Sequence, residues 1–203
     1  VEWHPAFCYA MRLDLREEQG LEYTDEYNLT SKPLKIDLMI IRKTTSIPML
    51  NKVGRIFKEH NVVEYKSPQD ALNIDTFYKS VAYACLYKIS PQRSNEVRAD
   101  QITITLVRDV KPKRLFKSLI SQGFDVDKVY KGVYYIYGSL FKTQIVVSSE
   151  LDEVENKWLK SLSLDIGKTL YLSLYDKREV LSEAEEKMAT VVRQAVSVAN
   201  RSN

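Results

Sequence analysis

The chain has few of the residues that mark small disulfide-rich or irregular proteins. Its 203 residues include only two cysteines, six glycines and six prolines. So few glycines and prolines exclude a low-complexity or linker-rich architecture. Cys8 and Cys85 lie within apolar helical patterns, where a buried reduced thiol is commoner than a disulfide or a metal ligand. The cysteines therefore predict a cytoplasmic protein.

Long hydrophobic runs and nucleotide-binding motifs are also missing. The longest apolar stretch, residues 81–86, is far shorter than the roughly 20 residues that span a bilayer. No basic segment followed by an apolar one opens the sequence, so we expect neither secretion nor membrane insertion. Glycine-rich dinucleotide and phosphate loops, C-x-x-C and H-E-x-x-H do not occur. Of the two histidines, His4 precedes a helical pattern and His60 ends a basic segment, which predicts capping or surface roles.

Basic residues gather in two clusters, although the net charge is only +3. Residues 42–58 contain five cations and no acid, and residues 108–117 contain five cations and one acid. Such clusters are either solvated surfaces or phosphate-binding surfaces. The residues of the first cluster that we expect to contact nucleic acid are Lys43, Lys52, Arg55 and Lys58.

The hydrophobic periodicity predicts one α/β domain whose first half has the order α-β-β-β-α-β. The predicted elements are a helix over residues 4–19, strands over 21–29, 36–41 and 61–66, a helix over 74–88 and a strand over 101–107. A turn is expected at 30–33. A short helix over 112–122 follows, then a hairpin of strands 129–137 and 141–148, and finally a helix over 181–200.

The predicted strands 36–41 and 61–66 carry two acids and a lysine that could form a site. Asp37 interrupts a strand that is otherwise apolar on both faces, and such a buried acid is costly. Glu64 and Lys66, two apart on the next strand, point to the same side. If the two strands are neighbours, both carboxylates can bind one Mg²⁺ or Mn²⁺, with the Tyr65 carbonyl as a further ligand. Lys66 would then position the nucleophile or stabilise developing charge.

The first helix offers a further acid for this site. Asp14 and Glu18 both fall within its apolar stripe, so we expect one of them, first of all Asp14, to face the sheet. Four acid-x-Lys triplets occur in the chain, but only that of Glu64 lies on a strand preceded by an apolar strand with an embedded acid. The alternative interpretation is an ordinary buried ion-pair network.

With these residues the sequence resembles the PD-(D/E)XK nucleases. That superfamily has an α-β-β-β-α-β core with an acid on the first helix, an Asp on the second strand and a (D/E)-x-K on the third. The matching residues are Asp14 or Glu18, Asp37, and Glu64-Tyr65-Lys66, while Pro33 stands four residues before Asp37 instead of adjacent to it. The stretch 1–110 is similar to an uncharacterised bacterial group related to transposase-type nucleases.

The resemblance implies a restriction-endonuclease-like fold with a mixed sheet and a metal-dependent nuclease that acts on DNA. We expect a nuclease-like domain over residues 1–150 and a C-terminal helical extension over 151–203 packed on it. An inactive nucleic-acid-binding or assembly module on the same fold is the alternative, because fold and function separate readily. The apolar seam of the last helix also predicts a homodimer through Leu181, Met188, Val191 and Ala195.

Overall fold

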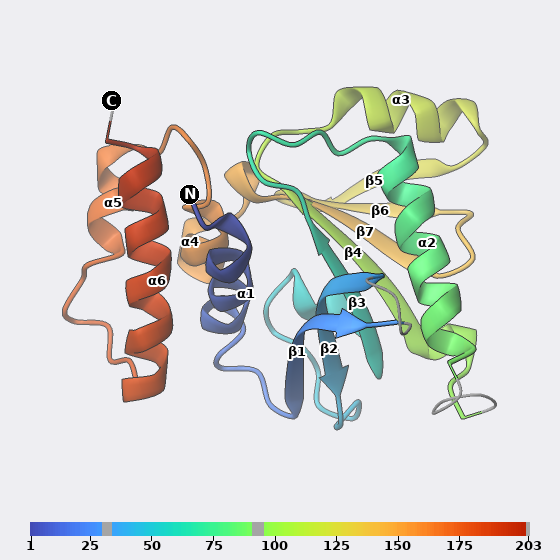
Figure 1. Cartoon of the computed structure of the whole chain (residues 1–203), viewed down its shortest axis with the longest axis horizontal. Coiled ribbons are helices and arrows are strands. Elements are labelled where there is room, and N and C mark those ends of the chain that lie inside the picture. Colours follow the sequence, from blue (N-terminus) through green and yellow to red (C-terminus); the bar gives the residue numbers. More distant parts are fainter. Residues whose placement is uncertain (30–33, 91–95, 202–203) are drawn as a thin grey trace.

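The protein is a mixed α/β molecule built on one seven-stranded sheet (Figure 1). The computed structural model describes residues 1–29, 34–90 and 96–201. The strands are β1 (Leu21–Asn28), β2 (Lys35–Arg42), β3 (His60–Tyr65), β4 (Ile102–Arg108), β5 (Asp125–Tyr130), β6 (Val133–Tyr137) and β7 (Lys142–Val147), in the spatial order β1-β2-β3-β4-β7-β6-β5. Neighbouring strands are antiparallel except for β3, β4 and β7, which run parallel to one another. The predicted α/β class and mixed sheet are thus confirmed.

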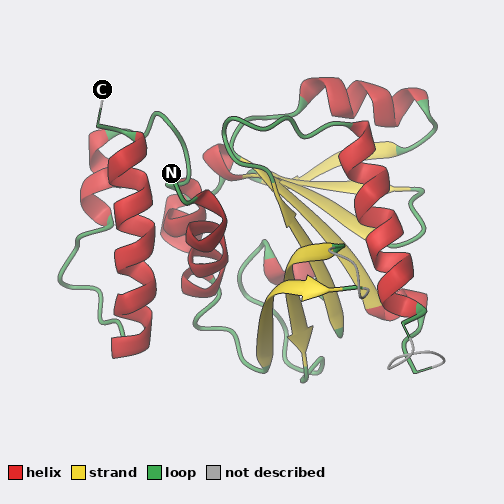
Figure 2. Cartoon of the chain, viewed as in Figure 1, coloured by secondary structure: helices red, strands yellow, loops and turns green. Residues whose placement is uncertain are grey.

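Helices cover both faces of the sheet (Figure 2). They are α1 (Trp3–Asp14), α2 (Ile74–Lys88), α3 (Lys113–Ser121), α4 (Glu153–Lys160), α5 (Lys168–Ser173) and α6 (Glu183–Ala199), with short 3₁₀ turns η1 (Gly54–Ile56), η2 (Ala99–Gln101) and η3 (Ser148–Glu150). The helices α2 and α3 lie on one side of the sheet, and α1, α4 and α6 lie on the other. No helix in the described part of the chain is both long and apolar enough to cross a membrane.

Each face of the sheet has its own hydrophobic core. On the α1 side, Phe7 and Met11 pack with Leu38 of β2, Trp158 of α4 and Val192 of α6. On the α2 side, the core contains residues of α2, α3 and the strands, among them Phe77, Tyr87, Ile104, Leu119 and Ile145. The strands between the two cores are therefore apolar on both faces, as the sequence of β2 predicts.

Most of the predicted elements are confirmed within one residue. The helix over 74–88 has the predicted bounds, and the first four strands begin and end within one residue of the prediction. Asn73 caps α2 by accepting a hydrogen bond from the Thr76 amide at 3.0 Å. The turn predicted at 30–33, which includes Pro33, lies outside the described residues.

Two predicted elements are wrong in their extent. The first helix ends at Asp14 instead of residue 19, and beyond it Glu18 accepts the amide protons of Leu50 and Asn51 at 2.9 and 2.7 Å. The strand expected over 129–137 is two strands, β5 and β6, joined at Gly132 with φ +75°. A Cβ at Gly132 would approach the Val147 carbonyl oxygen to 2.8 Å, so the turn requires glycine.

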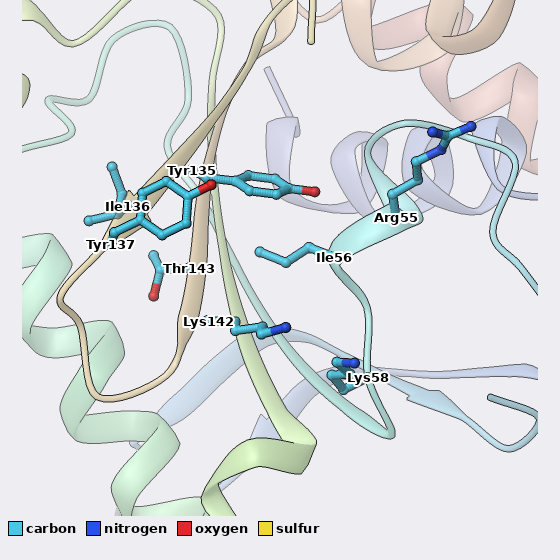
Figure 3. A pocket seen from close by; sticks show the side chains of 8 residues that line it. All are labelled: Arg55, Ile56, Lys58, Tyr135, Ile136, Tyr137, Lys142 and Thr143. Carbon is cyan, nitrogen blue, oxygen red and sulfur yellow. The ribbon is translucent and has the colours of Figure 1, made fainter. Parts of the chain in front are cut away.

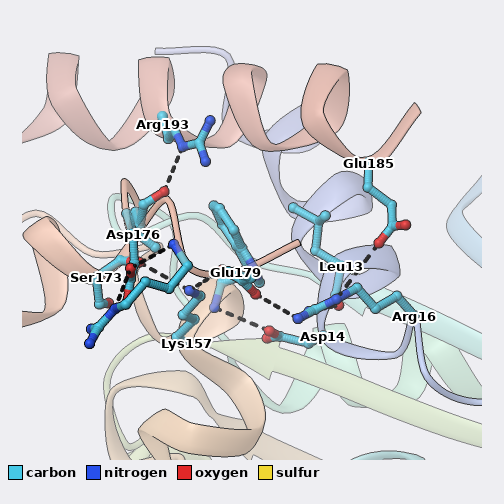
Figure 4. Close-up of polar contacts among 12 residues, drawn as sticks. Leu13, Asp14, Arg16, Lys157, Ser173, Asp176, Glu179, Glu185 and Arg193 are labelled. Carbon is cyan, nitrogen blue, oxygen red and sulfur yellow. Dashed lines mark hydrogen bonds and ion pairs between the residues drawn. The ribbon is translucent and has the colours of Figure 1, made fainter. Parts of the chain in front are cut away.

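Polar contacts fasten α1 to the C-terminal helices (Figure 4). The buried carboxylate of Asp14 accepts hydrogen bonds from the Trp158 and Leu159 amides of α4 at 3.2 and 2.8 Å. Burial raises the pKa of Asp14 to about 8, although these two amide donors oppose the shift. Next to it, Arg16 pairs with Glu179 at 2.5 Å. The C-terminal helices are therefore packed directly on the first helix.

The expected dimer seam lies partly within this same packing. Ala195 is buried in the core of its own chain, and Leu181 and Met188 are partly buried against that core. Val191 stays half-buried beside the first residues of the chain. The homodimer remains a prediction, with less free apolar surface than the sequence suggests.

The Asp14 contact generates a stability prediction. Replacing Asp14 by Ala leaves two buried amides of α4 without acceptors, and we expect a loss of about 2 kcal/mol or more of unfolding free energy. Glu18→Ala is the matched control, because that carboxylate also accepts two amides, one of them exposed. Water can replace it, so we expect a loss of about 1 kcal/mol or less. Urea denaturation at pH 7 measures the unfolding free energy of both variants. Equal losses would contradict the special role of the Asp14 contact between α1 and α4.

Candidate functional site

Asp37 and Glu64 face each other across the pair formed by β2 and β3. Leu38 pairs with Val63 in antiparallel register, so the next position along brings Asp37 opposite Glu64. The Tyr65 amide donates to Asp37 Oδ2 at 2.9 Å, which fixes the carboxylate against the backbone of β3. The structure thus brings together the two acids and the Tyr65 backbone that the sequence singles out.

Glu64 is a buried acid with an unsatisfied oxygen. Its exposed fraction is 5%, and Oε1 has no hydrogen-bond partner among the described residues. Burial, followed by the nearby charge of Asp37, raises the pKa of Glu64 to about 8. An orphaned carboxylate oxygen of this kind costs free energy unless a proton or a cation compensates it.

His4 is the site residue that sequence reasoning missed. It is the second residue of α1, and its Nε2 lies 3.5 Å from Asp37 Oδ1, with 35% of the His4 side chain and 27% of the Asp37 side chain exposed. The contact with Asp37 raises the pKa of His4. Burial alone would raise the pKa of Asp37, but His4 and the Tyr65 amide outweigh it and lower that pKa.

Two lysines come from the elements next to this pair. Lys66 follows β3, where its amide donates to the Val107 carbonyl of β4 at 2.9 Å. Its half-buried side chain forms no ion pair within residues 1–29, 34–90 and 96–201. Lys79 reaches toward the pair from α2 and partly offsets the raised pKa of Glu64. The site therefore has two acids and two cations at one end of the sheet.

Neither acid of the first helix joins this group, contrary to expectation. His4 marks the end of α1 that touches Asp37, and Asp14 lies ten residues further along, or about 15 Å at 1.5 Å per residue. Asp14 is instead bonded to α4, and Glu18 is bonded to the segment after β2. The apolar stripe correctly predicts that Asp14 is buried. Its side chain, however, faces α4 and not Asp37 and Glu64.

The first basic cluster does not flank the site either. The connection 43–59 leaves β2 at its end and enters β3 at its start, whereas Asp37 is near the start of β2 and Glu64 near the end of β3. The separation from Lys58 to Glu64 is six residues, or about 20 Å along a strand. Lys43 pairs with Glu22, and Lys52 pairs with Glu155 at 2.5 Å.

The second basic cluster lies at the site's end of the sheet. Tyr65 pairs with Val107 in parallel register, so Lys66 and Arg108 are adjacent at the ends of β3 and β4. Parallel neighbours point to the same side, which puts Arg108 on the side of Glu64 and Lys66. The next cations along the chain are Lys111 and Lys113, and the Lys111 ammonium lies over the Phe116 and Tyr134 rings.

The donor set suits a cation that keeps several waters. No group of three or more His, Cys, Asp or Glu side chains within the described residues is arranged to hold a metal ion. Asp37, Glu64 and the Tyr65 carbonyl nevertheless supply oxygen donors, and Mg²⁺ is commonly bound by one or two carboxylates with water and substrate oxygens completing its shell. Comparisons of the chain with protein-family models, curated proteins and solved structures return no match.

The raised pKa of Glu64 predicts a pH effect on stability. Unfolded Glu64 loses its proton near its ordinary pKa of 4.5, but the folded protein keeps it up to about 8. The unfolded state therefore binds fewer protons at Glu64 in this window, and the contribution of Glu64 to stability falls as the pH rises from 4.5 to 8.

Glu64→Gln keeps the neutral shape and removes this titration. We expect the variant to gain stability relative to the parent between pH 5 and pH 8, measured by urea denaturation. Asp127→Asn on the exposed face of β5 is the control and should follow the parent at every pH. A Glu64→Gln curve parallel to that of the parent would refute the raised pKa.

Proposed function

We propose that the chain is a metal-dependent nuclease that hydrolyses phosphodiester bonds, with DNA as the expected substrate. The observation that carries the proposal is the pair of Asp37, which is partly exposed, and the buried Glu64 with its orphaned oxygen, which lie side by side at the end of the sheet with Lys66 two residues beyond. Buried like charges persist in folded proteins when a cation or proton stands between them.

The topology of the first half supports the same proposal. The order α1-β1-β2-β3-α2-β4, with an antiparallel β1-β2-β3 unit and β4 parallel to β3, is compatible with the α-β-β-β-α-β core of the PD-(D/E)XK nucleases. The positions of Asp37 on the second strand and Glu64-Tyr65-Lys66 on the third match the superfamily pattern. The first helix departs from it, because His4 and not an acid lies beside Asp37.

The residues present fit a hard divalent cation. Asp37, Glu64 and the Tyr65 carbonyl would hold it, and the orphaned Glu64 oxygen is the donor most in need of a positive partner. When bound, Mg²⁺ or Mn²⁺ would supply a water of lowered pKa and neutralise charge on a phosphodiester.

The remaining groups act on the substrate and on protons. Lys66, on the side of Glu64, is placed to stabilise negative charge that develops on the phosphate oxygens. His4 holds the Asp37 carboxylate in position, and its partly exposed ring can exchange a proton with solvent. Lys79 of α2 and Arg108 at the end of β4 are further cations at this end of the sheet, and we assign them to phosphates of the bound strand.

The proposal predicts a linked loss of metal binding and cleavage. We expect Mn²⁺ at about 100 times its dissociation constant to stabilise the parent by about 2.7 kcal/mol, a rise of several degrees in Tm. Glu64→Gln and Asp37→Asn should lose both this rise and cleavage of plasmid, single-stranded DNA or RNA. Lys66→Ala should keep the Tm rise, because a cation is no ligand, and lose about 100-fold or more in rate.

Asp127→Asn is the control for loss of an acid elsewhere, and we expect parental cleavage and metal response from it. A parent that shows no metal-induced change in Tm and cuts none of the three substrates would refute the nuclease. The same result, together with retained nucleic-acid binding, would favour the inactive binding module.

A further inference from the structure

A cleft, shown in Figure 3, lies where β7 begins, and the register of β3, β4 and β7 puts it at the opposite end of the sheet from Asp37 and Glu64. It has a volume of about 310 Å³ and lies between the segment around η1 and the β6-β7 hairpin. The lining residues are Arg55, Ile56, Lys58, Tyr135, Ile136, Tyr137, Lys142 and Thr143. This volume is at the lower end of the ~300–1,000 Å³ range of small-molecule pockets, so the cleft accommodates one compact ligand unit.

Three of the residues that line the cleft are cations. Among the described residues, Arg55, Lys58 and Lys142 form no ion pair, and Arg55 instead donates to the Tyr130 hydroxyl at 3.3 Å. Figure 3 shows Lys142 extending from β7 toward Lys58 on the other wall. Arg55 extends away from these two lysines, and its guanidinium lies over the Tyr130 ring at 5.5 Å from the centroid. Lys58 and Lys142 come from two walls without an ion pair, which favours an anion between them.

Two tyrosines give the cleft an aromatic wall. Tyr135 and Tyr137 are neighbours on one side of β6, with ring centroids 6.4 Å apart and planes inclined by 71°. Tyr137 is 49% exposed and belongs to neither hydrophobic core. Ile56 faces Tyr135 from the opposite wall. An aromatic surface next to unpaired cations has the composition of sites that bind unpaired nucleotides.

Hydrogen bonds from buried side chains hold the walls in place. Gln144 of β7 donates to the Val53 carbonyl, just before η1, at 2.8 Å. Asn61 of β3 accepts from the Lys58 amide at 2.9 Å and donates to the Lys58 carbonyl at 2.7 Å. The cleft is therefore largely preformed, which lowers the entropic cost of binding.

We propose that this cleft binds a nucleoside phosphate unit. The base stacks on the exposed face of Tyr137 beside Tyr135, and the phosphate lies between Lys58 and Lys142, with Arg55 at the rim. The unit belongs either to a single strand or to a free mononucleotide. A paired base inside a duplex cannot offer its face to the tyrosines. Binding here does not depend on catalysis at Asp37 and Glu64.

Binding is measured in EDTA, so that metal-dependent cleavage cannot contribute. The probe is a fluorescent oligothymidylate of about 10 nucleotides, within the ~4–16 nucleotides typical of single-strand sites. We expect Tyr137→Ala to weaken binding about tenfold at every salt concentration, and Tyr137→Phe to restore it, because stacking needs the ring and not the hydroxyl. Titration with thymidine monophosphate in a second arm distinguishes a nucleotide site from a strand site.

The charge contacts are tested by salt dependence. The double variant Lys58→Ala, Lys142→Ala should flatten the slope of log affinity against log salt by about 1.4, since each lost single-strand contact removes about 0.7. Lys177→Ala, an exposed lysine between α5 and α6, is the single-charge control and should retain parental affinity. Parental binding by Tyr137→Ala and by the double lysine variant, or no binding of either probe by the parent, would overturn the proposal.

Discussion

The antiparallel register of β2 and β3 is the constraint on which the arrangement of the molecule depends. It brings Asp37 and Glu64 together between two hydrophobic cores, where water cannot solvate either carboxylate fully. The apolar faces of β2 and β3 make this register strong, because a one-residue slip would turn their core residues to the wrong faces. The fold thus holds two acids in proximity through the packing of their neighbours, at a cost that a proton on Glu64 relieves.

The same register separates the two positively charged regions of the protein. A connection between antiparallel neighbours joins the end of one strand to the start of the next, so the segment with Arg55 and Lys58 must lie at the far end from Asp37 and Glu64. Parallel neighbours end at the same edge of the sheet. Arg108 at the end of β4 therefore lies at the same edge as Lys66, which follows β3. The first basic cluster is therefore far from the two acids in space, although the connection that carries it joins their two strands.

Sequence patterns predict what is local in this protein and miss what is long-range. Strand bounds and α2 follow from apolar periodicity, and the pairing of Asp37 with Glu64 follows from two adjacent strands. Asp14 bonds to α4, which lies far along the chain, and hydrophobic periodicity cannot predict a contact between such distant segments. His4 reaches Asp37 through the packing of α1 on the sheet, which is a long-range contact that local periodicity does not predict. The turn at Gly132 could be predicted from the sequence, because an isolated glycine inside a strand pattern indicates a turn or a bulge.

Two buried acids differ in whether the protein itself satisfies their carboxylate oxygens. Asp14 and Glu64 are both buried, and burial raises the pKa of each to about 8. Both carboxylate oxygens of Asp14 accept hydrogen bonds from backbone amides of α4, and these bonds explain why an acid is buried there. Glu64 leaves Oε1 without a partner in the described protein, next to a second acid and at a sheet end open enough to expose part of Asp37. Hydrogen bonds to α4 therefore explain the burial of Asp14, whereas the buried carboxylate of Glu64 is compensated only by a proton or a cation.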